Sequence, residues 1–209
     1  MLCSGDKTKL LIVCNRETRE SKINSVNKHF TVKVCGKTIE ETCIEKLLGV
    51  IMSNNMSWNT HLYGNKETGK DKIQGLIPQL SQRVGMIAQL SKVMTKKQLK
   101  NIISGIFTSK LLYGIQLVSN VCGVVDMDDS SRRFISFTKE DCRKLQVLQN
   151  KVLRIQTGTK DRNEPTKNLL NKAQQLSVHQ LGAFHSVQLL FKVVTTHQPK
   201  FLADIFTLG

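Results

Sequence analysis

Three aspartates close together are the most obvious candidates for metal chemistry in this sequence. Asp126, Asp128 and Asp129 directly follow two valines. Carboxylates at such spacing can hold Mg²⁺ ions for phosphoryl or nucleotidyl transfer. No aspartate on an apolar strand precedes them, however, and two serines and two arginines follow at once. We therefore interpret the segment as a solvated loop, with a metal-binding acidic patch as the alternative.

The other residue types with intrinsic chemistry show no organised pattern. The six cysteines include no C-x-x-C pair, and the five histidines lack metal-ligand spacing, which argues against zinc and against a disulfide framework. Four cysteines lie in apolar contexts, so we expect free, buried thiols in a reducing compartment. No glycine-rich phosphate loop and no triad-like arrangement is present. We assign no catalytic residue and no metal ligand.

The charge balance is the strongest clue to a partner. The chain has 31 Lys and Arg against 16 Asp and Glu, a net charge of +15 over 209 residues. Such an excess most often indicates a nucleic-acid partner, with an acidic membrane surface second and a merely solvated basic surface as the plain alternative. Residues 1–9 contain no apolar signal-peptide core, and no apolar run is long enough to cross a bilayer. We therefore expect no membrane partner.

The elements before residue 64 have the character of strands and turns. We expect a central strand over residues 10–14, a half-buried strand over 30–34, and a hairpin turn at Gly36 and Lys37. The returning strand covers 39–41 and then 43–52, where Gly49 marks a bulge. A polar turn at 53–55 and the only tryptophan, Trp58, lead to a helix that starts near His61.

The remainder of the chain has the periodicity of helices. Apolar residues at spacings of three and four predict a helix to about residue 93. Capping boxes at Thr95, Thr138 and Ser177 begin three more, and Gly158 ends the second of these. The last is expected to be amphipathic, with an apolar stripe of Phe184, Val187, Leu190, Phe191 and Val194. A short helix is expected over 165–174, and residues 111–118 are expected to be deeply buried. The predicted fold is α+β and mostly α-helical: a small antiparallel sheet at the N-terminus followed by a helical bundle.

Five segments, in the same order, resemble the reverse transcriptases of non-LTR (LINE-type) retrotransposons. They are KTKLLIV (7–13), KLLGVIMSNNMSWNTHL (46–62), IPQLSQRVGMIAQLSKVMTKKQLKNIISGIFTSKLLYG (77–114), KLQVLQNKVLRIQTG (144–158) and EPTKNLLNKAQQLSVHQLGAFHSVQLLFKV (164–193). The resemblance implies the end of the palm over 1–64, a thumb-like helical region over 65–122 and a post-thumb helical region over 123–209.

In that family two Mg²⁺ ions, held by carboxylates, drive nucleotidyl transfer. The resemblance places those carboxylates upstream of KTKLLIV, where this sequence has only Asp6, so it implies a C-terminal fragment without catalytic aspartates. Mg²⁺ is then a cofactor of the full-length enzyme, and the remainder of that polypeptide is a partner. The aspartates at 126–129 follow the thumb-like helices, the wrong position for the catalytic hairpin. The resemblance also implies an intracellular protein of the cytoplasm or nucleus.

The thumb of such an enzyme grips an RNA–DNA hybrid or RNA template–primer by its phosphates, which requires basic side chains beside an apolar packing face. The matching candidates are Lys92, Lys96, Lys97 and Lys100, with Lys144, Lys151 and Arg154 as a second group. Leu48, Gly49 and Val50 resemble the primer-grip region, and a purely structural strand is an equal interpretation there. Two alternatives stay open: a non-catalytic basic helical module that binds RNA or protein, and a degenerate element product.

Overall fold

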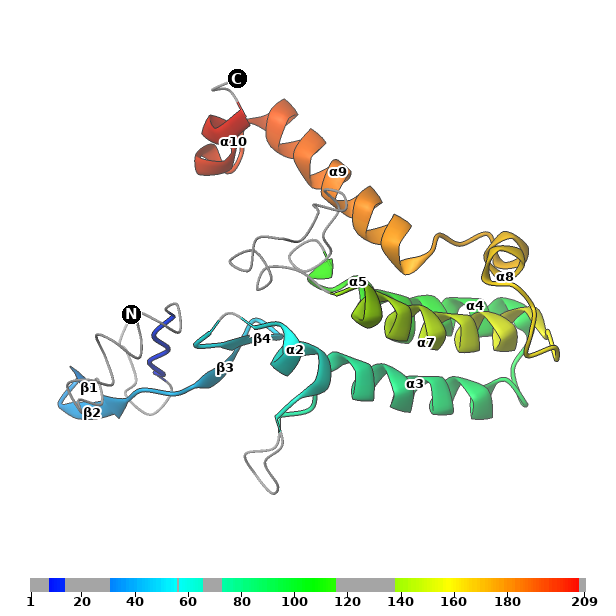
Figure 1. The fold of residues 1–209 in the computed structure, drawn as a ribbon, viewed down its shortest axis with the longest axis horizontal. Coiled ribbons are helices and arrows are strands. Elements are labelled where there is room, and N and C mark those ends of the chain that lie inside the picture. Colours follow the sequence, from blue (N-terminus) through cyan, green and yellow to red (C-terminus); the bar gives the residue numbers. More distant parts are fainter. Residues whose placement is uncertain (1–7, 14–30, 56, 66–72, 116–137, 207–209) are drawn as a thin grey trace. The chain divides into compact units, whose positions relative to one another are not determined.

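The computed structural model describes residues 8–13, 31–55, 57–65, 73–115 and 138–206. Its fold is α+β and mostly helical, as predicted, with the strands in the N-terminal region and helices after them (Figure 1). The described residues form two compact units: one ends at Leu76, and the other begins at Ile77. The three segments inferred from the resemblance stay a prediction.

The strands of the first unit form two separate hairpins instead of one sheet. In the first hairpin, β1 (Thr31–Val34) pairs antiparallel with β2 (Lys37–Glu40). Cys35 and Gly36 form its turn with φ angles of 50° and 78°, the backbone that a tight two-residue hairpin requires. The turn predicted at Gly36 and Lys37 was therefore wrong by one residue. β1 is mostly exposed, so its prediction as a half-buried strand was also wrong.

The second hairpin corrects the prediction for residues 43–52. β3 (Ile44–Leu47) pairs antiparallel with β4 (Val50–Ser53), and Leu48 and Gly49 form the turn between them. Their φ angles are 48° and 88°. Gly49 therefore lies in the turn between two strands instead of marking a bulge in a continuous strand. Positive φ at two consecutive residues reverses the chain, which an apolar run alone does not reveal.

The central strand predicted over residues 10–14 is not formed in its described part, 8–13. Leu10 makes one isolated parallel bridge with Glu41. Its carbonyl accepts hydrogen bonds from the backbone N–H of Thr42 at 2.8 Å and from the Thr42 hydroxyl at 3.2 Å. A strand needs neighbours along its whole length, and the described strands pair with each other.

The short helix α2 (Asn59–Tyr63) packs on β4 through a buried histidine, and it confirms the predicted helix at His61. The backbone N–H of Ile51 donates to His61 Nδ1 at 3.2 Å, and the Trp58 ring meets the imidazole edge-to-face with centroids 5.9 Å apart. Nδ1 is therefore a hydrogen-bond acceptor for the backbone of β4. His61 thus joins strand to helix.

Two glycines close the segment that follows α2. Gly64 and Gln74 form an antiparallel bridge, and the Asn65 side chain accepts from the Ile73 N–H at 2.7 Å. A Cβ added at Gly75 would collide with the backbone of Leu62, Tyr63 and Gly64. Only glycine permits this close approach of two backbone segments, so Gly64 and Gly75 fix the point from which the next helix departs.

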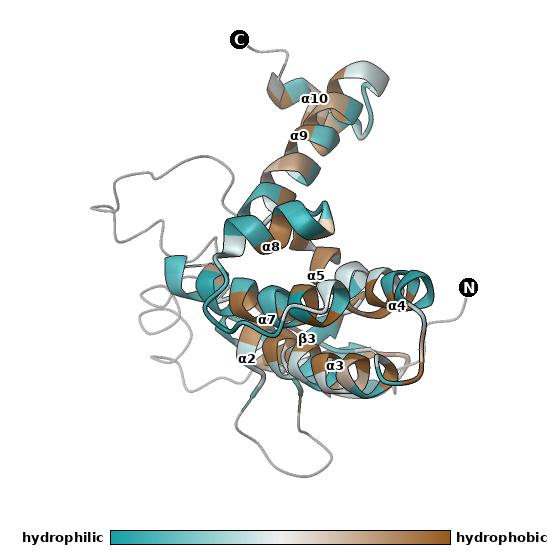
Figure 2. Ribbon diagram, turned by 90° about the vertical axis from the view of Figure 1, so that its right-hand side faces the viewer, coloured by the Kyte–Doolittle hydropathy of each residue, from teal (hydrophilic) through white to brown (hydrophobic). Residues whose placement is uncertain are grey.

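The helical unit is built around α3 (Leu76–Leu90), α4 (Lys96–Ile102) and α7 (Lys139–Thr157), which lie side by side in both ribbon views (Figures 1 and 2). Pro78 lies in the first turn of α3, where its missing N–H costs nothing. The predicted capping boxes of α4 and α7 are both present. The Arg83 guanidinium of α3 donates to the carbonyl of Ile106, which follows α4.

A π-helical stretch keeps the row of apolar side chains that begins in α4 facing the core. The helix continues through η5 (Ile103–Thr108), which is π-helical, into α5 (Ser109–Leu112). The buried residues of this helix recur at every fourth position: Leu99, Ile103, Phe107 and Leu111. An α-helix would turn this series away from the core by about 40° per step, and the wider π turn reduces that drift. Tyr113 is exposed, so the prediction of continuous burial from 111 was wrong there.

The C-terminal helices are α8 (Thr166–Ala173), α9 (Val178–Thr196) and α10 (Lys200–Phe206). α7 packs against both α8 and α9, and α10 packs against α9. Gly158 ends α7 in the left-handed conformation with φ 74°, and Ser177 caps α9 through Gln180, both as predicted. Pro165 is the N-cap of α8.

Amide side chains of α7 hold the start of the two helices that follow. Gln146 Oε1 accepts from the Val178 N–H at 2.9 Å, and buried Gln149 donates to the Leu176 carbonyl at 2.8 Å. Asn150 donates to the Thr166 hydroxyl at 2.7 Å. These α7 side chains thereby bind polar groups at the start of α8 and just before α9, and Gln146 satisfies one of the N–H groups that the start of α9 leaves unpaired.

The apolar stripe of the last long helix faces outward, contrary to the packing that its pattern suggested. In α9 the buried residues are Val178, Gly182 and Val193. The predicted stripe is exposed, and it comprises Phe184, Val187, Leu190, Phe191 and Val194. The helix and its capping box were predicted correctly, but the side of α9 that packs was not.

Candidate nucleic-acid interface

The first group of predicted phosphate contacts is exposed on one short stretch of the helical unit. Lys92 lies in the turn after α3, where backbone bonds from residues 91–94 return to the last turn of that helix. Lys96, Lys97 and Lys100 lie on the first two turns of α4, and all four side chains are exposed. Buried Leu99 anchors the same turns. This stretch combines exposed ammonium groups with an apolar packing face, as phosphate contact requires.

The electrostatics of this stretch favour anions. The first turn of α4 contains no acidic residue, and a helix N-terminus carries a partial positive charge of its own. The capping box uses Thr95 and Gln98, which are neutral: Thr95 N–H donates to Gln98 Oε1 at 3.1 Å, and Gln98 N–H donates to Thr95 Oγ1 at 3.4 Å. The lysines therefore add to the positive potential of the α4 N-terminus.

The second group is divided by the structure. Lys144 and Lys151 are exposed and lie seven residues apart, so they share one side of α7. Arg154 is half-buried, and its guanidinium donates to the Arg162 carbonyl at 2.8 Å. Arg154 therefore contributes to holding the loop after α7, and its role as a phosphate contact stays a prediction.

Two other basic residues of the helical unit are paired with acidic side chains. Arg143 makes a two-point contact with Glu140, with nitrogen–oxygen distances of 2.8 and 2.9 Å. The hydrogen bond from Arg143 lowers the pKa of the Glu140 carboxyl. Lys172 pairs with Glu164 at 3.0 Å. Arg143 and Lys172 are thus partly neutralised, whereas Lys96, Lys97 and Lys100 have no acid in the same turn.

Part of the second group lies toward the same end of the helical unit as the first group. α4 and α7 contact each other and run in opposite directions, so the start of α4 and the end of α7 lie at the same end (Figure 1). Lys151 therefore lies toward the α4 lysines, and Lys144 lies toward the other end. The loop after α7 adds exposed Lys160 and Arg162, which sequence analysis described only as a charged loop. The sequence signal that could have identified them is the position of this charged loop directly after a basic helix.

The three primer-grip-like residues form the tip of the second hairpin in the first unit. Leu48 and Gly49 are its turn residues and Val50 begins β4. Leu48 is 83% exposed, and neighbouring Leu47 is exposed as well. The chain reverses at Leu48 and Gly49, so only Val50 of the three lies in a strand, and the primer-grip and structural interpretations both stay open.

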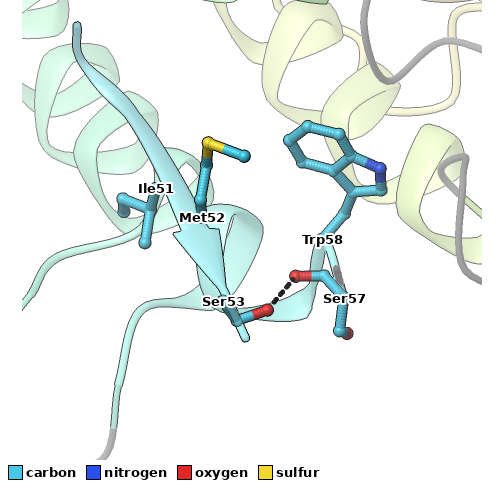
Figure 3. Close-up of a pocket in the computed structure, with 5 residues that line it drawn as sticks. All are labelled: Ile51, Met52, Ser53, Ser57 and Trp58. Atoms are coloured by element: carbon cyan, nitrogen blue, oxygen red, sulfur yellow. Dashed lines mark hydrogen bonds between the residues drawn. The ribbon is translucent and has the colours of Figure 1, made fainter. Parts of the chain in front are cut away.

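A small pocket lies behind this hairpin, between β4 and the start of α2. Ile51, Met52, Ser53, Ser57 and Trp58 line it (Figure 3). The Ser53 hydroxyl donates to the Ser57 carbonyl at 3.0 Å and closes one side. Its volume is on the order of one water molecule, so it is a packing gap and not a substrate site.

Within the described residues, the chemistry-bearing side chains form no metal-binding group of three or more His, Cys, Asp or Glu. Asp126, Asp128 and Asp129 lie outside those residues. Cys35 and Cys43 are exposed and Cys142 is half-buried, so the expectation of buried thiols was wrong for the first two. Burial, with a smaller effect of the Asp141 carboxylate, raises the pKa of the Cys142 thiol. None of the described helices combines the length and apolar character needed to cross a bilayer.

Comparison with known proteins adds no assignment: the chain matches no protein-family model, no curated protein and no solved structure. The candidate interface therefore rests on its own geometry and charge.

Proposed function

We propose that this chain contributes the nucleic-acid grip of a reverse transcriptase of the non-LTR type, and that the start of α4 holds a template–primer duplex by its phosphates. The observation that carries the proposal is the set of exposed lysines at residues 92, 96, 97 and 100, at a helix end without acidic neighbours. The order of the five family-like segments supports the class of enzyme.

The expected mode of recognition follows from the residue types. Lysine is a flexible point charge, which suits phosphate oxygens and carries little sequence information. The described part of α4 presents no aromatic side chain beside these lysines for base stacking. Binding is therefore backbone-directed, nearly independent of sequence and strongly dependent on salt. In this proposal nucleotidyl transfer, with its Mg²⁺ ions, belongs to carboxylates elsewhere in the enzyme.

The test is fluorescence anisotropy of the purified chain with a labelled RNA–DNA hybrid across a salt series. The triple variant Lys96→Ala, Lys97→Ala, Lys100→Ala removes three phosphate contacts. We expect at least a tenfold weaker affinity, and a slope of log K against log salt that is smaller by about 2 to 3.

The matched control removes the same charge from other places. The variant Lys33→Ala, Lys37→Ala, Lys200→Ala also lowers the net charge from +15 to +12, at exposed positions on other elements of the chain. If binding depends only on net charge, both triple variants weaken it equally and the α4 site is refuted. Absence of hybrid binding by the folded chain at low salt refutes the proposed function as a whole.

A further inference from the structure

The exposed stripe of α9 is a second surface that nucleic-acid binding does not use. Phe184, Val187, Phe191 and Val194 follow one another at spacings of three, four and three residues, the spacing of a coiled-coil seam. All four are exposed. The opposite side of α9 is packed inward through Val178, Gly182 and Val193. A continuous outward seam on a helix that is already anchored is a surface for another helix.

The order of large and small residues on the stripe indicates what that other helix is. In an antiparallel pair of identical α9 helices centred on residue 189, Phe184 lies opposite Val194 and Val187 lies opposite Phe191. Each phenylalanine thus meets a valine, and the two helices interlock. A parallel pair would place phenylalanine against phenylalanine and valine against valine. The stripe is therefore complementary to itself, as a two-fold contact between identical chains requires.

The charges on α9 agree with self-association. Between Val178 and Thr196 the only lysine or arginine is Lys192, and there is no acid. At 100° per residue, Lys192 lies about 120° from the centre of the stripe. Two copies of a +15 chain therefore meet here without like charges in contact. A helix that lies on an acidic membrane instead carries a row of Lys and Arg on its polar face, and α9 has none.

The exposed area sets the strength of the contact. Taking about 200 Å² for a phenylalanine side chain, Phe184 at 54% and Phe191 at 68% expose on the order of 250 Å². The aliphatic members of the stripe, with Leu190 at its edge, roughly double this. Two copies then bury about 1,000 Å² in total, which is the lower limit for a specific interface. The contact is therefore a reversible one.

We infer that α9 pairs antiparallel with the α9 of a second copy of this chain to form a weak two-fold dimer. This inference does not depend on the proposed function. Sedimentation velocity of the full chain over a hundredfold concentration range measures it directly. We expect the wild type to move from monomer toward dimer across the range.

Charge changes at paired positions test the register. Val187→Glu and Phe191→Lys each place a charge in the seam, and each variant alone is expected to raise the dimer dissociation constant at least tenfold. An equimolar mixture restores the dimer, because V187E in one copy then faces F191K in the other while the second Val187–Phe191 pair stays intact. In a parallel pair these positions do not meet, and mixing restores nothing.

The matched control is Ile205→Glu on α10. Ile205 is 63% exposed and Val187 60%, so each substitution adds one acid at a similarly exposed apolar position, and only V187E lies in the seam. Circular dichroism confirms folding of every variant. A wild type that stays monomeric throughout, equal effects of V187E and I205E, or a mixture that stays monomeric each overturns the inference.

Discussion

At the scale of single residues, backbone proximity decides which positions are irreplaceable. Gly75 lies against the backbone of Gly64 and Leu62, while Gly85, inside α3, has open space where a side chain would be. Sequence cannot separate them, because the contact that constrains Gly75 comes from residues at the end of α2.

Gly75→Ala should destabilise the first unit, because the added methyl group meets backbone atoms that cannot move aside. We expect a loss of about 1–3 kcal/mol, measured by urea denaturation with the fluorescence of Trp58, the only tryptophan. Gly85→Ala is the paired control. It should stabilise α3 by up to about 1 kcal/mol, since alanine is the better helix former. Equal effects from the two substitutions would show that the Gly64–Gly75 contact is absent.

At the scale of elements, local signals were predicted well and long-range ones were not. The capping boxes at Thr95, Thr138 and Ser177 are all present, because each depends on residues within one turn. The strand predicted through Leu48 and Gly49 failed, because an apolar run has the same composition on both sides of a turn. The site lysines were predicted as exposed for the same local reason, whereas the structural role of Arg154 depends on the loop eight residues later.

The amide row of α7 shows how a long-range contact is carried by residues that look unremarkable in sequence. Gln149 is buried, donates to the Leu176 carbonyl and accepts from Gln146 at 2.8 Å. Gln149→Leu keeps the volume but removes both hydrogen bonds, and only the Leu176 carbonyl loses its side-chain donor, because the Gln146 amide still donates to Asn150 Oδ1 at 2.9 Å. We expect a loss of about 0.5–1.5 kcal/mol by urea denaturation followed by circular dichroism.

The same substitution should also loosen the start of α9, since Gln146 binds the Val178 N–H beside it. Faster hydrogen exchange of amides in the first turns of α9 would report this. Exposed Gln82 of α3 provides the control, because Gln82→Leu removes no buried bond and should change stability by less than about 0.5 kcal/mol. Unchanged exchange in the Gln149 variant would contradict a linking role for the amide row.

At the scale of the whole molecule, the net charge of +15 favours binding of nucleic acid and opposes dimerisation. A duplex releases condensed counterions when lysines displace them, so added salt weakens its binding. Two copies of the chain repel each other, and added salt screens that repulsion, because the Debye length falls from about 30 Å at 0.01 M to about 10 Å at 0.1 M. The α9 seam itself is apolar and loses nothing on screening.

Raising the salt concentration from about 20 to 200 mM should therefore weaken binding of an RNA–DNA hybrid and strengthen dimerisation. Anisotropy and sedimentation velocity on one preparation measure both quantities. The α4 triple lysine variant should reduce the salt dependence of hybrid binding. By lowering the repulsion between two copies, it should also slightly favour the dimer. Val187→Glu should abolish dimerisation and with it the salt dependence of the dimer. It should leave hybrid affinity within about threefold of wild type, since the added acid on α9 is distant in sequence from the α4 lysines. Parallel salt dependence of the two equilibria would mean that nucleic acid and the second copy share a single charged surface.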